Sequence, residues 1–297
     1  MKVGIFGSEY QADKQNLIRR LFDKLQALEA EVYVDNTFYM YLTDALDFEP
    51  EITGLITNND VEFEHELDFV LSLGGDGTFL HTAARVNKQN IPILGINTGR
   101  LGFLADVSVR EIEETLEELY RNYYKIEERR LLQLSANGHP FKGFNYALNE
   151  VAILKRDTSS MIIIHTHLNG EYLTSYQADG LVIATPTGST AYSMSINGPI
   201  MIPQCDNLIL SPVAPHSLNV RPLVIPDNYT ISLGVESRNK TFLVALDGRS
   251  EVFPTGIQLT VKIADYTTKI IKRHNHTFYQ TLRDKLMWGA DARKKGL

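Results

Sequence analysis

The chain has 297 residues, 43% of them hydrophobic and 22% charged, and it carries a formal net charge of -7 at pH 7. Its length favours two compact units, and its acidic balance argues against binding nucleic acid through a basic surface. A single cysteine excludes an intrachain disulfide, and because no apolar run is long enough for a membrane helix or a signal peptide, we expect a soluble protein of the reducing cytoplasm.

The first part of the chain alternates strand and helix patterns. Residues 2–6 predict a short strand, and apolar residues recur at helical spacing over 17–28. The alternation continues with an apolar strand over 67–73, a helical stripe that starts at Phe79, and a strand over 91–96. Such βαβ units predict a parallel sheet that is covered by helices.

The pattern changes after about Arg130. Short β-rich runs are now separated by turn dipeptides at Asn137-Gly138, Asn169-Gly170 and Asp247-Gly248. We therefore expect an α/β + β fold, in which residues 1–130 form a Rossmann-like α/β domain and residues 131–270 a mostly antiparallel β-sandwich. The helical pattern within 271–297 could return to the first domain.

Two charged runs are expected to face solvent. Ser108 and Glu111 have the spacing of a capping box, and the helix behind them carries its acids, up to Glu118, mostly opposite an apolar stripe. The basic cluster Lys272-Arg273-His274 is expected to be solvated surface or tail charge. Neither run predicts a metal site or a nucleic-acid surface.

Residues 71–78 read L-S-L-G-G-D-G-T, an apolar strand that ends in three glycines around Asp76. Gly74, Gly75 and Gly77 leave backbone amides bare beside the start of a helix, where an anion is favoured. The sequence has neither G-x-x-x-x-G-K-[ST] nor a complete G-x-G-x-x-G, so a different phosphate-binding loop is predicted. Asp76 could accept a proton from a hydroxyl or help to hold a divalent cation. The alternative is a tight turn whose glycines supply positive φ.

Two further stretches carry polar groups that need a partner. T-P-T-G-S-T-A-Y-S-M-S at 185–195 follows a strand and gathers hydroxyls and free amides, which suit a ribose or a phosphate, although an ordinary capped connection would look similar. Asn149-Glu150 and Asp179 lie beside apolar runs, where a buried acid must be paired or bound to a ligand. The alternative for Glu150 is an edge strand with the acid facing water.

Taken together, these stretches resemble the bacterial NAD kinases. The resemblance runs from about residue 67 to Asp247-Gly248-Arg249, and the G-G-D-G loop alone is shared with lipid kinases and phosphofructokinases. It is carried by L-S-L-G-G-D-G-T-F-L at 71–80, G-I-N-T-G-R-L-G-F-L at 95–104, L-N-E at 148–150, D-G at 179–180 and T-P-T-G-S-T-A-Y-S at 185–193. Arg249 stands where family members differ, so no role is implied for it.

The resemblance implies a phosphotransferase that uses ATP to phosphorylate the 2′-hydroxyl of the adenosine ribose of NAD, giving NADP and ADP. It implies that Asp76 is the catalytic base and that the neighbouring glycines contact phosphate. Asn149 and Glu150 would bind the adenosine ribose or its neighbourhood. The other implied contacts to the dinucleotide are Asp179, Thr190, Ala191, Tyr192, Ser193, Met194 and Ser195. His81 could reach a phosphate or lie on the surface.

The expected partners are the small molecules NAD and ATP and a divalent cation, with Mg²⁺ favoured, but neither nucleic acid nor a membrane. The resemblance also implies a homodimer or homotetramer. One rival is a lipid kinase of the diacylglycerol or sphingosine type, for which the acidic chain shows no clear membrane-facing surface. The other is a module that senses NAD without catalysis, and the presence of Asp76 among its glycines argues against it.

Overall fold

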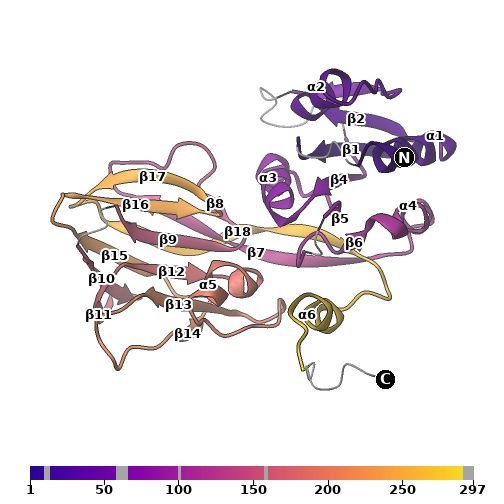
Figure 1. Cartoon of the computed structure of the whole chain (residues 1–297). Helices are drawn as coiled ribbons and strands as arrows, with labels where there is room; N and C mark the ends of the chain where they lie inside the picture. The colour runs from indigo at the N-terminus through magenta and orange to yellow at the C-terminus, as the bar shows by residue number, and fades with distance from the viewer. Residues whose placement is uncertain (10–13, 58–65, 100–101, 157–159, 290–297) are drawn as a thin grey trace. The chain divides into compact units, whose positions relative to one another are not determined.

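The computed structural model describes residues 1–9, 14–57, 66–99, 102–156 and 160–289. The chain forms two compact units (Figure 1). The first comprises Met1–Glu128 together with Thr268–Leu297, and the second comprises Arg129–Thr267. Two long strands, β7 (Lys125–Ala136) and β18 (Leu259–Lys272), carry the chain from one unit into the other.

The first unit is built on a parallel sheet with the strand order β18-β5-β4-β1-β2-β3, and β6 pairs with β5. Its strands are β1 (Lys2–Gly7), β2 (Glu31–Asp35), β3 (Gly54–Ile56), β4 (Phe69–Gly74), β5 (Ile93–Asn97) and β6 (Val107–Ser108). Its helices are α1 (Gln15–Ala27), α2 (Asn36–Asp44), α3 (Asp76–Val86), α4 (Ile112–Tyr120) and α6 (Phe278–Leu286).

Burial in the first unit follows the sequence patterns. All six residues of β4 are buried, as expected of a strand that is covered on both faces of a parallel sheet. α1 buries one stripe along its length, made of Leu17, Ile18, Leu21, Phe22 and Leu25. These side chains join those of the parallel strands in one hydrophobic core.

The second unit contains two antiparallel layers. A six-stranded sheet has the order β14-β13-β12-β9-β16-β17, and the other layer runs β11-β10-β15-β18. The strands are β8 (Tyr146–Ala147), β9 (Glu150–Lys155), β10 (Ile162–Leu168), β11 (Glu171–Ala178), β12 (Gly180–Ala184), β13 (Asn207–Val213), β14 (Leu223–Pro226), β15 (Ile231–Glu236), β16 (Thr241–Leu246) and β17 (Arg249–Pro254). Alternate side chains of both layers meet in one core, so the predicted fold class of α/β plus antiparallel β is confirmed.

Two of the three predicted turns are hairpin turns. Asn169-Gly170 and Asp247-Gly248 both have positive φ at each residue and close the hairpins β10–β11 and β16–β17. Asn137-Gly138 differs, because only Gly138 has positive φ and a longer connection follows before β8. Among the described residues, no helix is long and apolar enough to cross a membrane.

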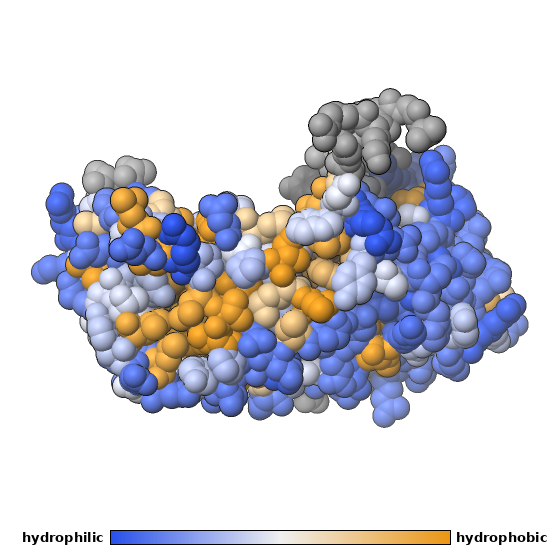
Figure 2. All heavy atoms as spheres, turned by 90° about the horizontal axis from the view of Figure 1, so that it is seen from below, coloured by the Kyte–Doolittle hydropathy of each residue, from blue (hydrophilic) through white to orange (hydrophobic). Residues whose placement is uncertain are grey.

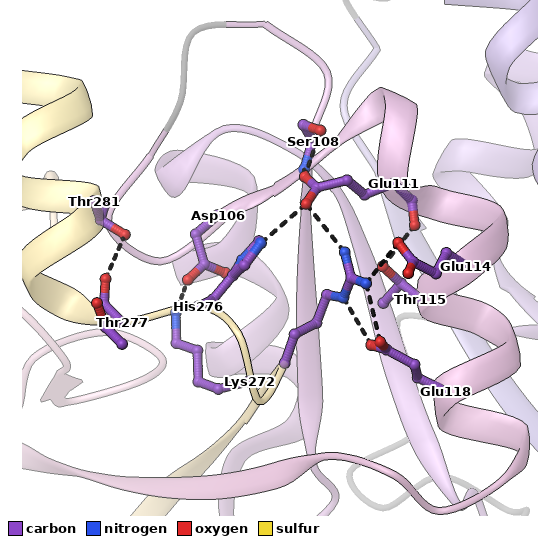
Figure 3. A network of polar contacts seen from close by, with 11 residues as sticks. Asp106, Ser108, Glu111, Glu114, Thr115, Glu118, Lys272, His276, Thr277 and Thr281 are labelled. Atoms are coloured by element: carbon purple, nitrogen blue, oxygen red, sulfur yellow. Dashed lines mark hydrogen bonds and ion pairs between the residues drawn. The ribbon is translucent and has the colours of Figure 1, made fainter.

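The expectation that the basic cluster at 272–274 is solvated was wrong for its first two residues. Lys272 and Arg273 are buried, and Lys272 donates to Asp106 at 2.6 Å. Arg273 binds three acids of the segment expected to face solvent, namely Glu111 at 3.0 Å, Glu114 at 2.7 Å and Glu118 at 2.7 Å. Figure 3 shows this network, in which His276 also contacts Glu111.

The network changes the titration of its acids. The hydrogen bond from Arg273 lowers the pKa of Glu118 below its usual value. Burial alone would raise the pKa of Glu111, but hydrogen bonds from Ser108 and His276 bring it below its usual value. Since Ser108 also completes the predicted capping box with Glu111, one acid both caps the 3-10 turn that precedes α4 and helps to fix the C-terminal segment.

Candidate functional site

Asp76 lies where the glycine loop passes from β4 into α3. β4 ends at Gly74 and pairs in parallel with β5, with Gly74 opposite Asn97, so that two strand ends meet here. The carboxyl ends of parallel strands are where α/β sheets bind ligands. A side chain at Gly74 would meet Thr78 Oγ1 at 2.2 Å, so that position needs glycine for packing.

The carboxylate of Asp76 binds the loop that follows β5. It accepts hydrogen bonds from the backbone amides of Phe103 at 3.0 Å, Leu104 at 3.0 Å and Ala105 at 3.1 Å. A Cβ atom at Gly102 would lie 2.0 Å from Asp76 Oδ1, so glycine is required for this close approach. Asp76 is therefore fixed in place, with its side chain still 30% exposed.

The motif at 95–104 explains how that loop is held. Asn97 is buried, accepts a hydrogen bond from Gly99 N at 2.8 Å and donates to Ala105 O at 3.3 Å. A side chain at Gly95 would meet Ala105 Cα at 2.6 Å. Arg100 and Leu101 of the motif lie outside the described residues.

Gly75 and Gly77 have no packing reason to be glycine. A Cβ atom at either position would meet nothing within 4 Å, and neither residue has positive φ. The alternative of a tight turn with glycines chosen for positive φ is therefore wrong for these two positions. Their missing side chains leave backbone amides open at the N-terminus of α3, which can receive an anion.

A second group forms in the other unit around Asn149 and Glu150. Asp247, in the hairpin turn after β16, accepts hydrogen bonds from the backbone amides of Leu148 at 2.7 Å, Asn149 at 2.8 Å and Glu150 at 3.2 Å. Glu150 is 8% exposed and starts β9, which lies between β12 and β16. The alternative of an exposed edge strand is therefore wrong.

The stretch at 185–195 packs on this group. Thr185 Oγ1 donates to Leu148 O at 2.6 Å, and a Cβ atom at Gly188 would lie 2.1 Å from Asn149 O. The chain then forms a 3-10 turn at Thr187–Thr190 and the short helix α5 (Tyr192–Ser195), whose first residue donates its backbone amide to Glu150.

The side chains of this stretch differ in their roles. Ser193 is fully buried and its Oγ lies 3.3 Å from Ser211 Oγ, so it packs inside the unit. Ser195 donates to Tyr192 O at 2.7 Å, and Thr190 donates to Thr187 O at 3.4 Å. The predicted residues Ala191 and Met194 belong to the same turn. Backbone positions of the stretch therefore approach Asn149 and Glu150, while several of its hydroxyls bond locally.

The pKa of Glu150 is unusually high for a glutamate. Burial raises its pKa from 4.5 to about 8, the charge of Asp247 adds to the rise, and the hydrogen bond from Tyr192 opposes it. Desolvation also raises the pKa of Asp247, which is half-buried, although three backbone amides and Arg249 favour its ionised form. Among the described residues, Glu150 Oε2 has no hydrogen-bond partner. A buried acid with one unpaired oxygen points to a ligand.

Within a single chain, Asp179 lies far from Asn149 and Glu150. It precedes β12 and binds Lys155 at 2.7 Å, whereas Ala184, at the opposite end of β12, pairs with Glu150. At the rise of an extended strand this separates Asp179 from Glu150 by about 16 Å.

Two more residues are placed by the structure. His81 is exposed and lies further along α3 than the glycine loop. Arg249 donates to the carbonyls of Phe144 and, at 2.6 Å, Tyr146, so it supports the chain before β9. Asp247 belongs to the group around Asn149 and Glu150, but its sequence predicted only a turn. The Asp-Gly dipeptide carries no information about the contact between Asp247 and Asn149.

Comparisons with known proteins cover nearly the whole chain. Family models described as the ATP-NAD kinase N-terminal domain and the ATP-NAD kinase C-terminal domain match residues 3–124 and 148–273. A NAD kinase from Bacteroides fragilis is 54% identical over 293 residues, covering 99% of this chain and 100% of the relative. A NAD kinase from Porphyromonas gingivalis is 47% identical over 292 residues, covering 98% and 99%.

Two solved structures share the fold. A NAD kinase from Archaeoglobus fulgidus in complex with ATP has a TM-score of 0.75 and 26% identity, covering 97% of this chain and 99% of that chain. A yeast NADH kinase complexed with NADH has a TM-score of 0.87 and 22% identity, covering 98% and 88%.

The raised pKa of Glu150 predicts a fall in stability with pH. Because folding raises this pKa from 4.5 to about 8, its stabilising effect is complete below about pH 4.5 and is lost as the pH rises toward 8. Glu150→Gln carries no proton to lose, so its unfolding free energy should fall less steeply, the difference being up to about 1.4 kcal/mol per pH unit.

Urea denaturation at several pH values between about 5 and 8 measures this difference. Glu171→Gln is the control, because Glu171 is an exposed acid of the same unit. Equal slopes for Glu150→Gln and the unmodified protein would contradict the prediction.

Proposed function

The chain belongs to the ATP-NAD kinase family, and we propose that Asp76 is the base that takes the proton from the 2′-hydroxyl of the adenosine ribose of NAD. The protein is a kinase that phosphorylates NAD with ATP. The position of Asp76 is the observation that carries the proposal. Three backbone amides hold its carboxylate, and the glycines on either side of it, Gly75 and Gly77, have open space where a side chain would be.

In the proposed step one bond to phosphorus forms and another breaks. The ribose oxygen attacks the terminal phosphorus of ATP, a new O–P bond forms, and the bond to the bridging oxygen of ADP breaks. The hydroxyl proton goes to Asp76, which as a carboxylate is suited to accept it. Phosphoryl transfer needs mainly positioning and neutralisation of charge, which open amides at Gly75 and Gly77 and the N-terminus of α3 can supply.

We propose that a divalent cation, Mg²⁺ in the first place, accompanies ATP. Among the residues that the structure describes, no three His, Cys, Asp or Glu side chains are grouped to hold a metal. Mg²⁺ is commonly bound through substrate phosphates with few protein ligands, so this donor set suits an ion that arrives with the nucleotide. When bound, it would neutralise phosphate charge. We assign it no protein ligand.

Asn149 and Glu150 are proposed to bind the ribose. A carboxyl group whose pKa is about 8 is mostly protonated at neutral pH, so it can donate one hydrogen bond and accept another. A sugar hydroxyl offers the matching acceptor and donor. The unpaired Oε2 of Glu150 supports this role, and the nearby turn at 190–195 would contact the rest of the dinucleotide.

The rival functions gain no support. Both family models and the relatives described above are NAD kinases, not lipid kinases or sensors without catalysis. We further propose that the protein works in the cytoplasm, in keeping with its single cysteine.

We also propose that the chain assembles into a dimer or tetramer, as sequence resemblance implies. Asp179 lies far from Glu150 within one chain, so a second copy would have to bring it to the dinucleotide. β14 is an edge strand of its sheet, and Leu223, Val224 and the 88% exposed Leu218 lie on it or just before it. Figure 2 shows hydrophobic residues gathered broadly on one face of the protein. Exposed apolar surface of this kind suits contact between copies.

Asp76→Asn tests the base directly. The amide retains the size of the carboxylate but cannot accept the proton, so kcat for NADP formation should fall by about 10²–10⁴-fold. NADP formed from NAD, ATP and Mg²⁺ is the measurement. Asp68→Asn, which changes an acid just before β4 that binds Lys2 N, is the matched control and should stay active. Near-normal turnover of Asp76→Asn would remove Asp76 from the mechanism.

Gly77→Ala tests the open amides. No atom lies within 4 Å of the added Cβ, so the fold should be unharmed, and the helix residue should gain about 0.5–1 kcal/mol of unfolding free energy. kcat/KM for ATP should nevertheless fall at least about tenfold, because the added methyl group would occupy the space in which the phosphate is proposed to bind. Gly234→Ala, also without a close contact, is the control. Full activity of Gly77→Ala would contradict phosphate binding at this loop.

Mixed oligomers test the shared site. Asp76→Asn and Asp179→Ala chains should each have low activity alone. Co-expressed, they should recover up to about a quarter of normal activity, because a mixed pair regenerates one intact site. Co-expression of Asp76→Asn with Gly77→Ala, which damage one loop, should recover nothing. Absence of recovery in the first mixture, with assembly verified by light scattering, would contradict the proposal.

A further inference from the structure

The described residues already use every acceptor position of Asp76. A carboxylate offers about four lone-pair positions. Leu104 N and Ala105 N occupy those of Oδ1, while Phe103 N at 3.0 Å and Lys285 Nζ at 3.4 Å occupy those of Oδ2. A base must accept a hydrogen bond from the hydroxyl it deprotonates. One of these four contacts therefore has to be exchanged when a substrate hydroxyl arrives.

Lys285 makes the contact that is easiest to exchange. Its distance is the longest of the four, and its side chain is 31% exposed, whereas the amides belong to a loop that Asn97 and Gly95 hold in place. Exposed ion pairs are weak, and a lysine side chain is long and flexible. The exchange would thus free Oδ2 without disturbing the loop.

α6 keeps Lys285 beside Asp76 even without this hydrogen bond. Lys285 Nζ lies 4.4 Å from the centroid of the Phe103 ring, and the Phe278 ring packs 6.1 Å from the same ring. Phe278 and Lys285 lie two helical turns apart, and the buried Thr281 and Leu282 fall between them on one face. The helix therefore lays this face on the loop that binds Asp76.

Two acids of the described residues that lie next to these segments in the chain face other groups. Asp106, which follows the loop, binds Lys272 at 2.6 Å. Asp284 of α6 lines a cavity of about 240 Å³ together with Glu111 and His276. Lys285, within the part of the chain that the structure describes, is a cation in contact with the proposed base.

We propose that Lys285 binds the phosphoryl group that is transferred, exchanging its contact with Asp76 for one with the terminal phosphate of the nucleoside triphosphate. This inference depends on the proposed role of Asp76. The attacking oxygen must lie within hydrogen-bond distance of Asp76, and the phosphorus about 3–3.5 Å beyond it. An ammonium group 3.4 Å from Asp76 on a flexible stem reaches that region, and lysine is a common ligand of phosphate.

Lys285→Met is the first test, because it retains the apolar stem over Phe103 but removes the charge. We expect kcat to fall about 100-fold, as when one preorganised donor to a transition state is lost, with thermal unfolding unchanged. Lys285→Arg retains a positive charge, so its kcat should be at least about tenfold higher than that of Lys285→Met. Arg283→Met, an exposed residue of the same helix, should behave like the unmodified protein.

Chemical rescue separates contact with phosphate from a structural role. In Lys285→Ala, propylammonium added to the assay should raise kcat at least about fivefold, because a free amine can occupy the position of the lost ammonium. Propanol at equal concentration should not. A purely structural role for Lys285 would respond to neither.

The outcomes also distinguish this inference from the proposed function. If the unmodified protein is active and Asp76→Asn is not, but Lys285→Met stays within twofold of normal, the inference about Lys285 is wrong and the function stands. Equal losses in Lys285→Met and Lys285→Arg, with a lower unfolding temperature and no rescue by amine, also overturn it. If Asp76→Asn is fully active, the proposed role of Asp76 fails, and the inference about Lys285 fails with it.

Discussion

The first unit depends on the hydrogen bonds between the Asp76 carboxylate and the amides at 103–105. One side chain at the start of α3 thereby fixes the loop that follows β5. Charged hydrogen bonds of this kind are stronger than neutral ones, and the N-terminus of a helix favours a negative charge. The same contact explains why Gly102 and Gly95 bear no side chain, since both would collide with this arrangement. The proposed base is therefore also a structural residue, and its geometry is set before any substrate binds.

A second constraint acts on the C-terminal segment. Burying Lys272 and Arg273 would be costly without partners, and the structure provides Asp106 for the first and three glutamates for the second. The hydrogen bonds that Arg273 donates to Glu118 and Glu114 raise the pKa of Arg273 above its usual value, so its charge is retained. Such a network tolerates little displacement, because any lost partner would leave a buried charge. It therefore fixes the chain that leads into α6, on which Lys285 lies next to Asp76.

Local patterns predicted most of the fold because their causes are local. The capping box at Ser108 and Glu111, the hairpin turns at Asn169 and Asp247, and the apolar strand before Gly74 all follow from neighbouring residues. The basic cluster at 272–273 was misjudged because its acidic partners lie more than a hundred residues away in the chain, where hydropathy carries no information about pairing. The contacts of Asp247 with Asn149 and of Lys285 with Asp76 are equally remote in sequence. The glycine loop and Asp76 could be identified from the sequence. Three glycines around one acid form an unusual local pattern, and recognising it requires no knowledge of which distant residues contact the loop.

The neighbouring acids Glu150 and Asp247 of the second unit provide a different chemistry from the glycine loop. Asp247 accepts three backbone amides, which stabilise its ionised form, whereas Glu150 has a single amide and an unpaired oxygen. Because two neighbouring carboxylates repel each other, the charge of Asp247 raises the pKa of Glu150 further. A protonated carboxyl group, as expected for Glu150 near neutral pH, both donates and accepts hydrogen bonds and so matches a hydroxyl group better than a phosphate. Open amides at a helix N-terminus have the opposite preference. In the proposed mechanism, two small groups of residues with different charge therefore bind the sugar and the phosphate, which is the division that phosphorylation of a dinucleotide ribose requires.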